Sequence, residues 1–297
     1  MDISLDVERL LGMLRPGQAG QQLYRVVDPL DAPERRLTTQ QLSECGVLAN
    51  PFLALAPTKQ LYLQREELDD ALLRDAVTAE IARLDEPSGG ARPFCGWILS
   101  EYALPTVVGY LQRKLTLVSP EGKAALFRFH DPRVLQRLTA ILTQAQLSRL
   151  LGPVNSWFYF DHKKCLCEVA PHGNKRHLGR LHVLPEQWQS IRRISIVNEC
   201  LASLKHQRWA QSAEISLDAI DRLVMSAQEC GLSDSKDIRF FVMHGLYSHK
   251  DFYRHPIITR LLPRLASNRS YVALTNSITG NDWATISKDM REAVNDE

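Results

Sequence analysis

The stretch of residues 115–151 constrains the fold more than any other part of the chain. It reads LTLVSPEGKAALFRFHDPRVLQRLTAILTQAQLSRLL. Two apolar segments, 115–118 and 123–129, flank a Ser-Pro-Glu-Gly sequence that favours a tight turn. In the second segment, alternate residues would face opposite sides of a sheet, so that Phe127 and Phe129 share one side. The stretch therefore predicts a β-hairpin with an aromatic face.

A capped helix is predicted directly after this hairpin. Asp131 has the side chain of a helix N-cap, and Pro132 fits the first helical position, where its missing N–H has no consequence. A second, shorter helix is expected at 143–151, ending at Gly152-Pro153. The first helix is predicted from apolar residues at helical spacing: Val134, Leu135, Leu138, Ile141 and Leu142.

Strand and helix patterns alternate in the N-terminal part, whereas only helical patterns follow Pro185. This alternation favours an α/β fold in which at least part of the sheet is parallel. We expect an α/β N-terminal lobe with a mixed sheet at 1–184, followed by an all-α C-terminal lobe at 185–297. The predicted strands outside the hairpin are 23–27, 52–56, 94–99, 157–161, 164–170 and 181–184. The predicted helices of the flanking regions are 66–84, 103–114, 186–205, 217–230, 235–247, 256–265 and 283–294.

Composition narrows the classes of function. The chain has 297 residues with 44% hydrophobic and 24% charged residues and a net charge of +2, which is ordinary for a globular protein. A nearly neutral chain gives no reason to expect nucleic acid or an anionic membrane as partner. It contains no apolar run of about 18 residues, and its N-terminal sequence lacks the basic-then-apolar order of a secretory signal. We expect a cytoplasmic protein with reduced cysteines and no membrane span.

Residues 162–182 offer the best candidates for metal ligands. They include two cysteines and four histidines: His162, Cys165, Cys167, His172, His177 and His182. Thiolates and imidazoles bind zinc, so a metal-dependent enzyme that uses this segment is an alternative function. However, the two cysteines are spaced C-x-C along a predicted strand, and no second pair follows at zinc-ribbon spacing. We favour a plain hairpin, with no metal, no cofactor and no catalytic residues.

The same segment is basic, with Lys163, Lys164, Lys175, Arg176 and Arg180 against few acidic residues. A basic patch can bind nucleic acid or an acidic protein. Since the whole chain is nearly neutral, a solvated loop is the preferred interpretation, and an acidic protein partner is the second.

Arg128, Asp131 and Arg133 form the charged group of the central stretch. In the structural interpretation, Asp131 caps its helix and Arg128 pairs with Asp131 or with Glu101. In the functional interpretation, the arginines contact a partner, because a guanidinium makes several hydrogen bonds at once. The structural interpretation is the preferred one.

The central stretch and its continuation resemble the hallmark of the type VI secretion adaptor chaperones, whose shared domain was first described as one of unknown function. The matching features are a strand that ends in an aromatic-Arg-aromatic pattern, an Asp-Pro-Arg corner, a leucine-rich helix, a Leu-Leu-Gly-Pro helix end and a strand that begins with Trp. In this chain they are Phe127-Arg128-Phe129, Asp131-Pro132-Arg133, the helix that follows, Leu150-Leu151-Gly152-Pro153 and Trp157. The likeness covers about residues 20–162, including QLYRVVDPL and ECGVLANPFLALAP upstream. The chain departs from the family at His130, where an aromatic residue is usual.

The resemblance implies a binding protein that is not an enzyme. Such adaptors bind a specific toxic effector in the cytoplasm and deliver it to the VgrG spike. We further expect the variable helical lobe to select the cargo, because a common first lobe cannot by itself distinguish different cargoes. We also expect an Arg133→Glu change to weaken effector binding without unfolding the protein. The partner-binding candidates are the hallmark residues Phe127, Arg128, Phe129, Asp131, Arg133 and Trp157.

Overall fold

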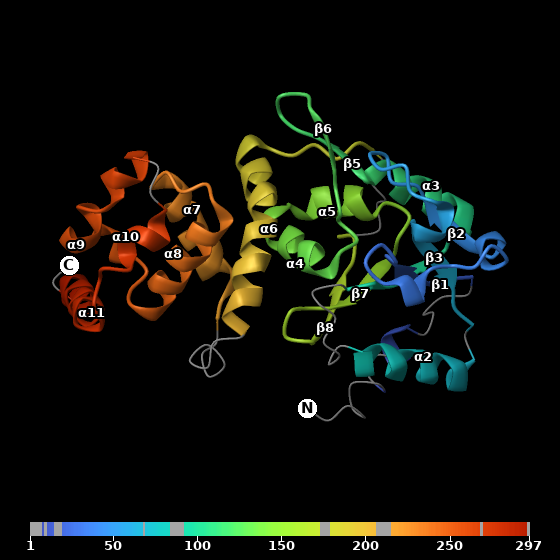
Figure 1. Cartoon of the computed structure of the whole chain (residues 1–297). Coiled ribbons are helices and arrows are strands. Elements are labelled where there is room, and N and C mark those ends of the chain that lie inside the picture. Colours follow the sequence, from blue (N-terminus) through green and yellow to red (C-terminus); the bar gives the residue numbers. More distant parts are fainter. Residues whose placement is uncertain are drawn as a thin grey trace. The chain divides into compact units, whose positions relative to one another are not determined.

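The computed structural model describes residues 8, 11–14, 20–67, 69–83, 92–172, 179–205, 215–267 and 270–295. The chain divides into two compact units, residues 1–191 and 192–297 (Figure 1). Strands and helices make up the first unit, and the described part of the second is helical. This confirms the predicted fold class of an α/β lobe followed by an all-α lobe. Within the described ranges, no helix is both long and apolar enough to cross a bilayer.

A six-stranded sheet forms the centre of the first unit, with the strand order β2-β3-β1-β4-β7-β8. Each neighbouring pair among these described strands is antiparallel. All seven residues of the central strand β4 are buried, because other elements cover both faces of the sheet. The strands are β1 (Gln22–Val27), β2 (Cys45–Leu48), β3 (Leu61–Arg65), β4 (Phe94–Ser100), β7 (Ser156–Phe160) and β8 (Leu166–Val169).

The expectation of parallel pairing is wrong, although its reasoning is partly correct. β3 and β4 both run antiparallel to β1, so these two strands point in the same direction, as strand–helix–strand order predicts. β1 lies between them and takes the hydrogen bonds that they would otherwise share. The order of strand, helix and strand therefore predicted the relative direction of β3 and β4. It did not predict that β1, which comes earlier in the chain, would lie between them.

The apolar run 52–56, predicted as a strand, lies instead in a loop. Pro51 and Pro57 lack the N–H that a strand ladder uses, and Pro57 begins a 3₁₀ helix, η3 (Pro57–Lys59). The strands β2 and β3 lie on either side of this loop and pair with each other. Segment 181–184, also predicted as a strand, has no strand pairing.

Helices cover the two faces of the sheet (Figure 1). α2 (Asp70–Arg83) packs against one face, where Leu73 and Val77 join a core cluster with Trp97, Phe158 and other residues. α4 (Pro132–Ile141) and α5 (Gln144–Leu151) lie on the other side together with α3 (Leu104–Lys114). A separate two-stranded sheet follows α3, formed by β5 (Thr116–Val118) and β6 (Ala124–Leu126), which confirms the predicted hairpin. The predicted extent of its second strand is wrong, because β6 ends at Leu126 and residues 127–129 lie outside it.

The second unit is a set of helices around one aromatic-rich core. Phe241 contacts the rings of Phe252 and Tyr271, and all three are buried. A Cβ added at Gly245 would lie 2.4 Å from the Leu223 side chain, so the glycine permits two helices to approach closely. The elements are α6 (Pro185–Lys205, which begins in the first unit), α7 (Leu217–Glu229), α8 (Ser235–Tyr247), η5 (Phe252–Arg254), α9 (Pro256–Thr259), η6 (Leu262–Ser267), α10 (Tyr271–Thr275) and α11 (Gly280–Asn295).

Candidate functional site

The corner between the hairpin and α4 is fixed by Asp131, which is 7% exposed. Its carboxylate accepts a hydrogen bond from the backbone N–H of Arg133 at 2.9 Å, which confirms the predicted N-cap. The Arg133 side chain also donates to the same carboxylate through Nε at 3.0 Å and Nη2 at 2.7 Å. Burial raises the pKa of Asp131, but the hydrogen bonds and charge of Arg133 outweigh burial and lower it. Asp131 and Arg133 therefore act as one structural unit.

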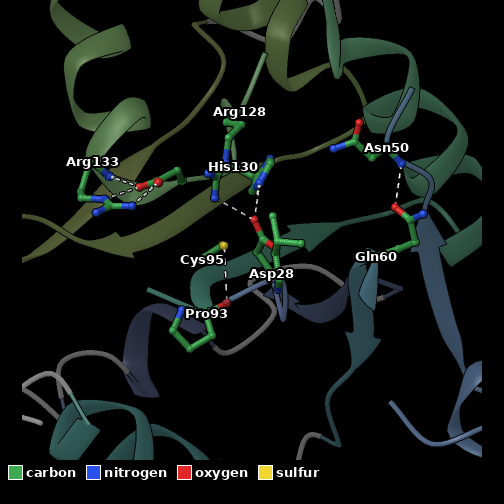
Figure 2. Close-up of polar contacts among 10 residues, drawn as sticks. Asp28, Asn50, Gln60, Pro93, Cys95, Arg128, His130 and Arg133 are labelled. Carbon is green, nitrogen blue, oxygen red and sulfur yellow. Dashed lines mark hydrogen bonds and ion pairs between the residues drawn. The ribbon is translucent and has the colours of Figure 1, made fainter. Parts of the chain in front are cut away.

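Arg128 pairs with Asp28, which the sequence analysis did not consider as its partner. Arg128 Nη2 and His130 Nε2 both lie 3.1 Å from Asp28 Oδ2 (Figure 2). The expectation that Arg128 pairs with Asp131 or Glu101 is wrong; Glu101 instead accepts a hydrogen bond from Asn155. Asp28 directly follows β1, which lies inside the central sheet between β3 and β4, so this contact ties the hairpin corner to the end of an inner strand.

The electrostatics of Asp28 follow from these neighbours. Burial raises the pKa of its carboxyl, whereas the hydrogen bond from His130 and the charges of His130 and Arg128 lower it, with a net pKa of about 2. The second carboxylate oxygen accepts the backbone N–H of Leu30 at 3.1 Å. Since a carboxylate only accepts, His130 donates through Nε2. Its buried Nδ1 has no hydrogen-bond partner within the described part of the chain.

Phe127, Phe129 and Trp157 are core residues, 3%, 1% and 0% exposed. The Phe129 ring lies 5.8 Å from Phe127 and 5.9 Å from Trp157 between ring centroids. Trp157 Nε1 donates to the Cys95 carbonyl at 3.1 Å, so its polar atom is satisfied. These three side chains pack beneath the corner, and their partner-binding role stays a prediction. The side chains of Arg128 and Arg133 are 40% and 32% exposed and reach the surface.

The loop 51–57 lies beside this corner and exposes apolar side chains. Phe52 and Leu53 are each 46% exposed. The backbone of this loop is fixed by Asn50, whose Oδ1 accepts the backbone N–H groups of both residues. Gln60 in turn accepts the Asn50 N–H at 2.7 Å (Figure 2). It also donates to the Leu55 carbonyl at 2.9 Å.

A cavity of about 130 Å³ opens between this loop and the corner. Its wall is mainly leucine, and its polar edge brings Asp28, Arg128 and His130 to the same place. This site was not predicted from the sequence. One feature of the sequence marked it, the apolar run 52–56 enclosed by Pro51 and Pro57. The lining residues are Asp28, Leu30, Leu48, Asn50, Leu53, Leu55, Lys59, Gln60, Leu61, Leu115, Leu126, Arg128 and His130.

Five of the six cysteine thiols are in surroundings that suppress reactivity. Burial, together with the negative charges of Asp28 and Asp131, raises the pKa of Cys95 well above its usual value. Burial also raises the pKa of Cys45, Cys167 and Cys230, and raises that of Cys200 to about 12. A thiol with a raised pKa is protonated at neutral pH and is a weak nucleophile and metal ligand.

The Cys/His segment supplies the turn after β7 and the strand β8 of the β7–β8 hairpin, and its members have separate structural roles. Asp161 Oδ1 accepts the backbone N–H groups of Lys163 and Cys165 at 2.8 Å, which closes the turn. His162 Nδ1 lies 2.8 Å from the side-chain nitrogen of Gln136. His177 lies outside the described residues. Among the residues that are described, no three or more His, Cys, Asp or Glu side chains are grouped as a metal ion requires.

The fold and the site together define a two-unit protein with a charged, hydrogen-bonded corner beside an exposed apolar loop, a combination common at binding surfaces. Residues 23–149 match the sequence model of a family described as "Domain of unknown function (DUF4123)". The match runs from β1 into α5 and contains the loop 51–57, Asp28 and the corner. No curated protein and no solved structure gives a significant match to the chain.

Proposed function

We propose that this protein is a cytoplasmic adaptor that binds one toxic effector and loads it onto the VgrG spike of a type VI secretion system. The observation that carries the proposal is the family match over residues 23–149. It falls on the segment whose Asp-Pro-Arg corner resembles the adaptor chaperones. The protein acts by binding its partners and catalyses no reaction.

The exposed loop 51–57 and the adjoining cavity are the docking face for a partner. Phe52 and Leu53 leave large apolar areas in water, and burying such area drives most protein association. The cavity next to them provides a pocket in which an apolar anchor of the partner fits. Arg128 at its edge supplies the polar contact that orients the partner.

The Asp28–His130 contact supports this face from the inside. Asp28 binds Arg128 on the same oxygen that receives the His130 hydrogen bond, so the guanidinium is held at the cavity edge. A side chain positioned before the partner arrives loses less conformational entropy on binding. The hallmark residues Phe127, Phe129 and Trp157 then act indirectly, by packing under the corner.

The helical unit at 192–297 is the part that selects the effector. Adaptors that share one N-terminal domain need a second surface to distinguish their cargoes. Tyr247 at the end of α8, 63% exposed, and Met225 on α7, 40% exposed, are apolar contact residues available there.

The experiment is co-expression of the tagged chain with the products of its adjacent reading frames and with the spike protein, followed by affinity purification. The proposal expects the effector and the spike protein to co-purify in stoichiometric amounts. A tagged chain carrying Phe52→Asp and Leu53→Asp is the matched loss-of-binding variant. If neither protein co-purifies with the wild-type chain, the proposed function is wrong.

A further inference from the structure

A second cavity, of about 490 Å³, lies on a different side of the hairpin, between α3, β5 and residues 179–181. Its volume is within the range of sites that bind a ligand or a short peptide. Tyr110, Leu117, Val118, Phe127 and Leu181 provide its apolar wall. The remaining lining residues are Arg113, Lys114, Thr116, Gly179 and Arg180.

This groove carries positive charge without a matching negative charge. Arg113, Lys114 and Arg180 line it, and none of the described lining residues is acidic. Lys114 is 8% exposed, donates to the Gly179 carbonyl and lies 4.6 Å above the Tyr110 ring centroid. No carboxylate of a described residue pairs with it. Buried ammonium groups normally have such a partner, so the groove is incomplete without an anion.

The protonation of Lys114 agrees with this environment. Burial lowers the pKa of its ammonium group, and repulsion from Arg113 and Arg149 lowers it further, to about 8. Burial is the largest cause, and the smaller contributions of Arg113 and Arg149 reflect a positive potential at this position, which attracts an anionic ligand. At neutral pH the ammonium group remains charged and available to that ligand.

Among the residues that the structure describes, the second edge of β5 has no strand partner, and this edge faces the same groove. The residues that flank β5 bond toward the β6 side: the Leu115 carbonyl accepts the Phe127 N–H, and the Ser119 N–H donates to the Lys123 carbonyl. Because backbone groups alternate in direction along a strand, those of Leu117 also face β6. The N–H and C=O groups of Thr116 and Val118 therefore point away from β6. All three β5 residues line the groove, although their side chains alternate in direction, so the strand faces the groove with its edge.

We propose that this groove binds an acidic peptide segment of a partner protein, which adds to β5 as a third strand. Its backbone would pair with Thr116 and Val118, and its carboxylates would meet Arg113, Lys114 and Arg180. Alternate apolar side chains of the same segment would pack on Leu117 and Phe127. Strand addition of this kind obtains affinity from main-chain hydrogen bonds and specificity from side-chain contacts. The inference rests on the proposed adaptor function for the source of the segment.

The direct test is fluorescence anisotropy with the full chain and a labelled peptide, Gly-Glu-Val-Glu-Val-Glu-Val-Gly, at pH 7 and low salt. We expect saturable binding that weakens as salt is added. The counterpart with lysine in place of glutamate, and one with proline at the central valine, should each bind about tenfold more weakly or worse. A labelled single-stranded oligonucleotide serves as the competing anion.

Variants of the chain locate the binding. Arg113→Glu with Arg180→Glu should weaken binding of the acidic peptide about tenfold. Arg260→Glu with Arg264→Glu makes the same charge change at two exposed arginines of the second unit and should have no effect. Val118→Pro removes an outward N–H that the β5–β6 ladder does not use, and should weaken binding with the melting temperature unchanged.

The result that overturns the inference is absence of saturable binding, equal binding of the lysine peptide, or no effect of Arg113→Glu with Arg180→Glu. Tighter binding of the oligonucleotide than of the peptide would also overturn it, since the site would then serve phosphate. None of these arms uses the effector or the spike. Co-purification of both with the wild-type chain can therefore succeed while the groove inference fails, and the reverse.

Discussion

His130 Nε2 lies 3.1 Å from Asp28 Oδ2, although the two residues are 102 positions apart in the chain. This contact connects the end of β1 to the hairpin corner and shares its carboxylate oxygen with Arg128. His130 stands where the adaptor chaperones that the sequence resembles usually have an aromatic residue. In the structure it keeps an aromatic contact, with its ring edge-on to Phe129 at 6.0 Å, and adds a hydrogen bond that Phe could not make.

The Asp28 pKa predicts how stability depends on pH. The folded pKa of about 2 lies below the ordinary value of 3.8, so the unfolded chain binds the proton first as pH falls. The resulting stabilisation is complete above about pH 4 and is lost between about pH 4 and pH 2, and amounts to about 2 kcal/mol. Asp28→Asn should lower the free energy of unfolding at pH 7 and flatten its fall in this interval.

Urea unfolding at pH 7, 4 and 3 measures this effect. Asp75→Asn, which changes an exposed carboxylate on α2, is the matched control and should leave the pH dependence unchanged. An equally steep fall in Asp28→Asn and wild type would show that Asp28 makes no such contribution.

The Asp131–Arg133 pair changes the expectation for Arg133→Glu. Because Arg133 donates two side-chain hydrogen bonds to the buried Asp131, a glutamate there would face another carboxylate. We expect Arg133→Glu to cost about 2 kcal/mol of stability. Arg133→Met, which keeps the aliphatic part, should cost less than Arg133→Glu.

Comparing thermal unfolding of these two variants with their effector binding separates the two roles of Arg133. If Arg133→Glu melts with the wild type and only loses binding, the side chain is a contact residue and the structural account of the pair is wrong.

Gly96 should tolerate no side chain. Its φ is +132°, and an added Cβ would lie 2.2 Å from the Phe158 carbonyl oxygen across the β4–β7 pair. Gly122 also has a positive φ, +82°, but an added Cβ would meet open space there. We expect Gly96→Ala to cost more than about 3 kcal/mol and Gly122→Ala about 1 kcal/mol. Similar melting temperatures for the two variants would contradict the close approach of β4 and β7.

The loop 51–57 should be needed for binding and unnecessary for folding. Phe52→Ser with Leu53→Ser removes exposed apolar area, so the melting temperature should change little. Co-purification of the partner should fall about tenfold or more if these side chains are anchors. Leu72→Ser on α2 removes a leucine that is 53% exposed and should leave co-purification unchanged. Equal effects of the two changes would mean that general surface hydrophobicity, and not this loop, is responsible.

Local patterns in the sequence predicted the local elements well. The predicted helix at 235–247 coincides with α8 (Ser235–Tyr247), and Asp131 caps α4 as its position before Pro132 indicated. Helical spacing and caps depend on residues a few positions apart, which a single sequence displays. The same holds for the turn that joins β5 and β6.

Features that depend on distant residues were not predictable in this way. The placement of β1 between β3 and β4, and the pairing of Asp28 with Arg128, join segments separated by many residues. The run 52–56 was apolar for a reason other than strand formation, since Phe52 and Leu53 face solvent. The positive charge of the groove was also not predictable, because Arg113 and Arg180 lie far apart in the sequence and line the same groove only in the folded chain.

Reconstitution of loading with purified proteins tests the proposed adaptor function. The effector and the spike protein would be mixed with and without this chain, and the complex measured by size-exclusion chromatography with light scattering. The account predicts that effector and spike elute together only when the wild-type chain is present, and that Phe52→Ser with Leu53→Ser does not support this complex. An effector–spike complex that forms equally well without the chain, or never forms with it, would contradict the account.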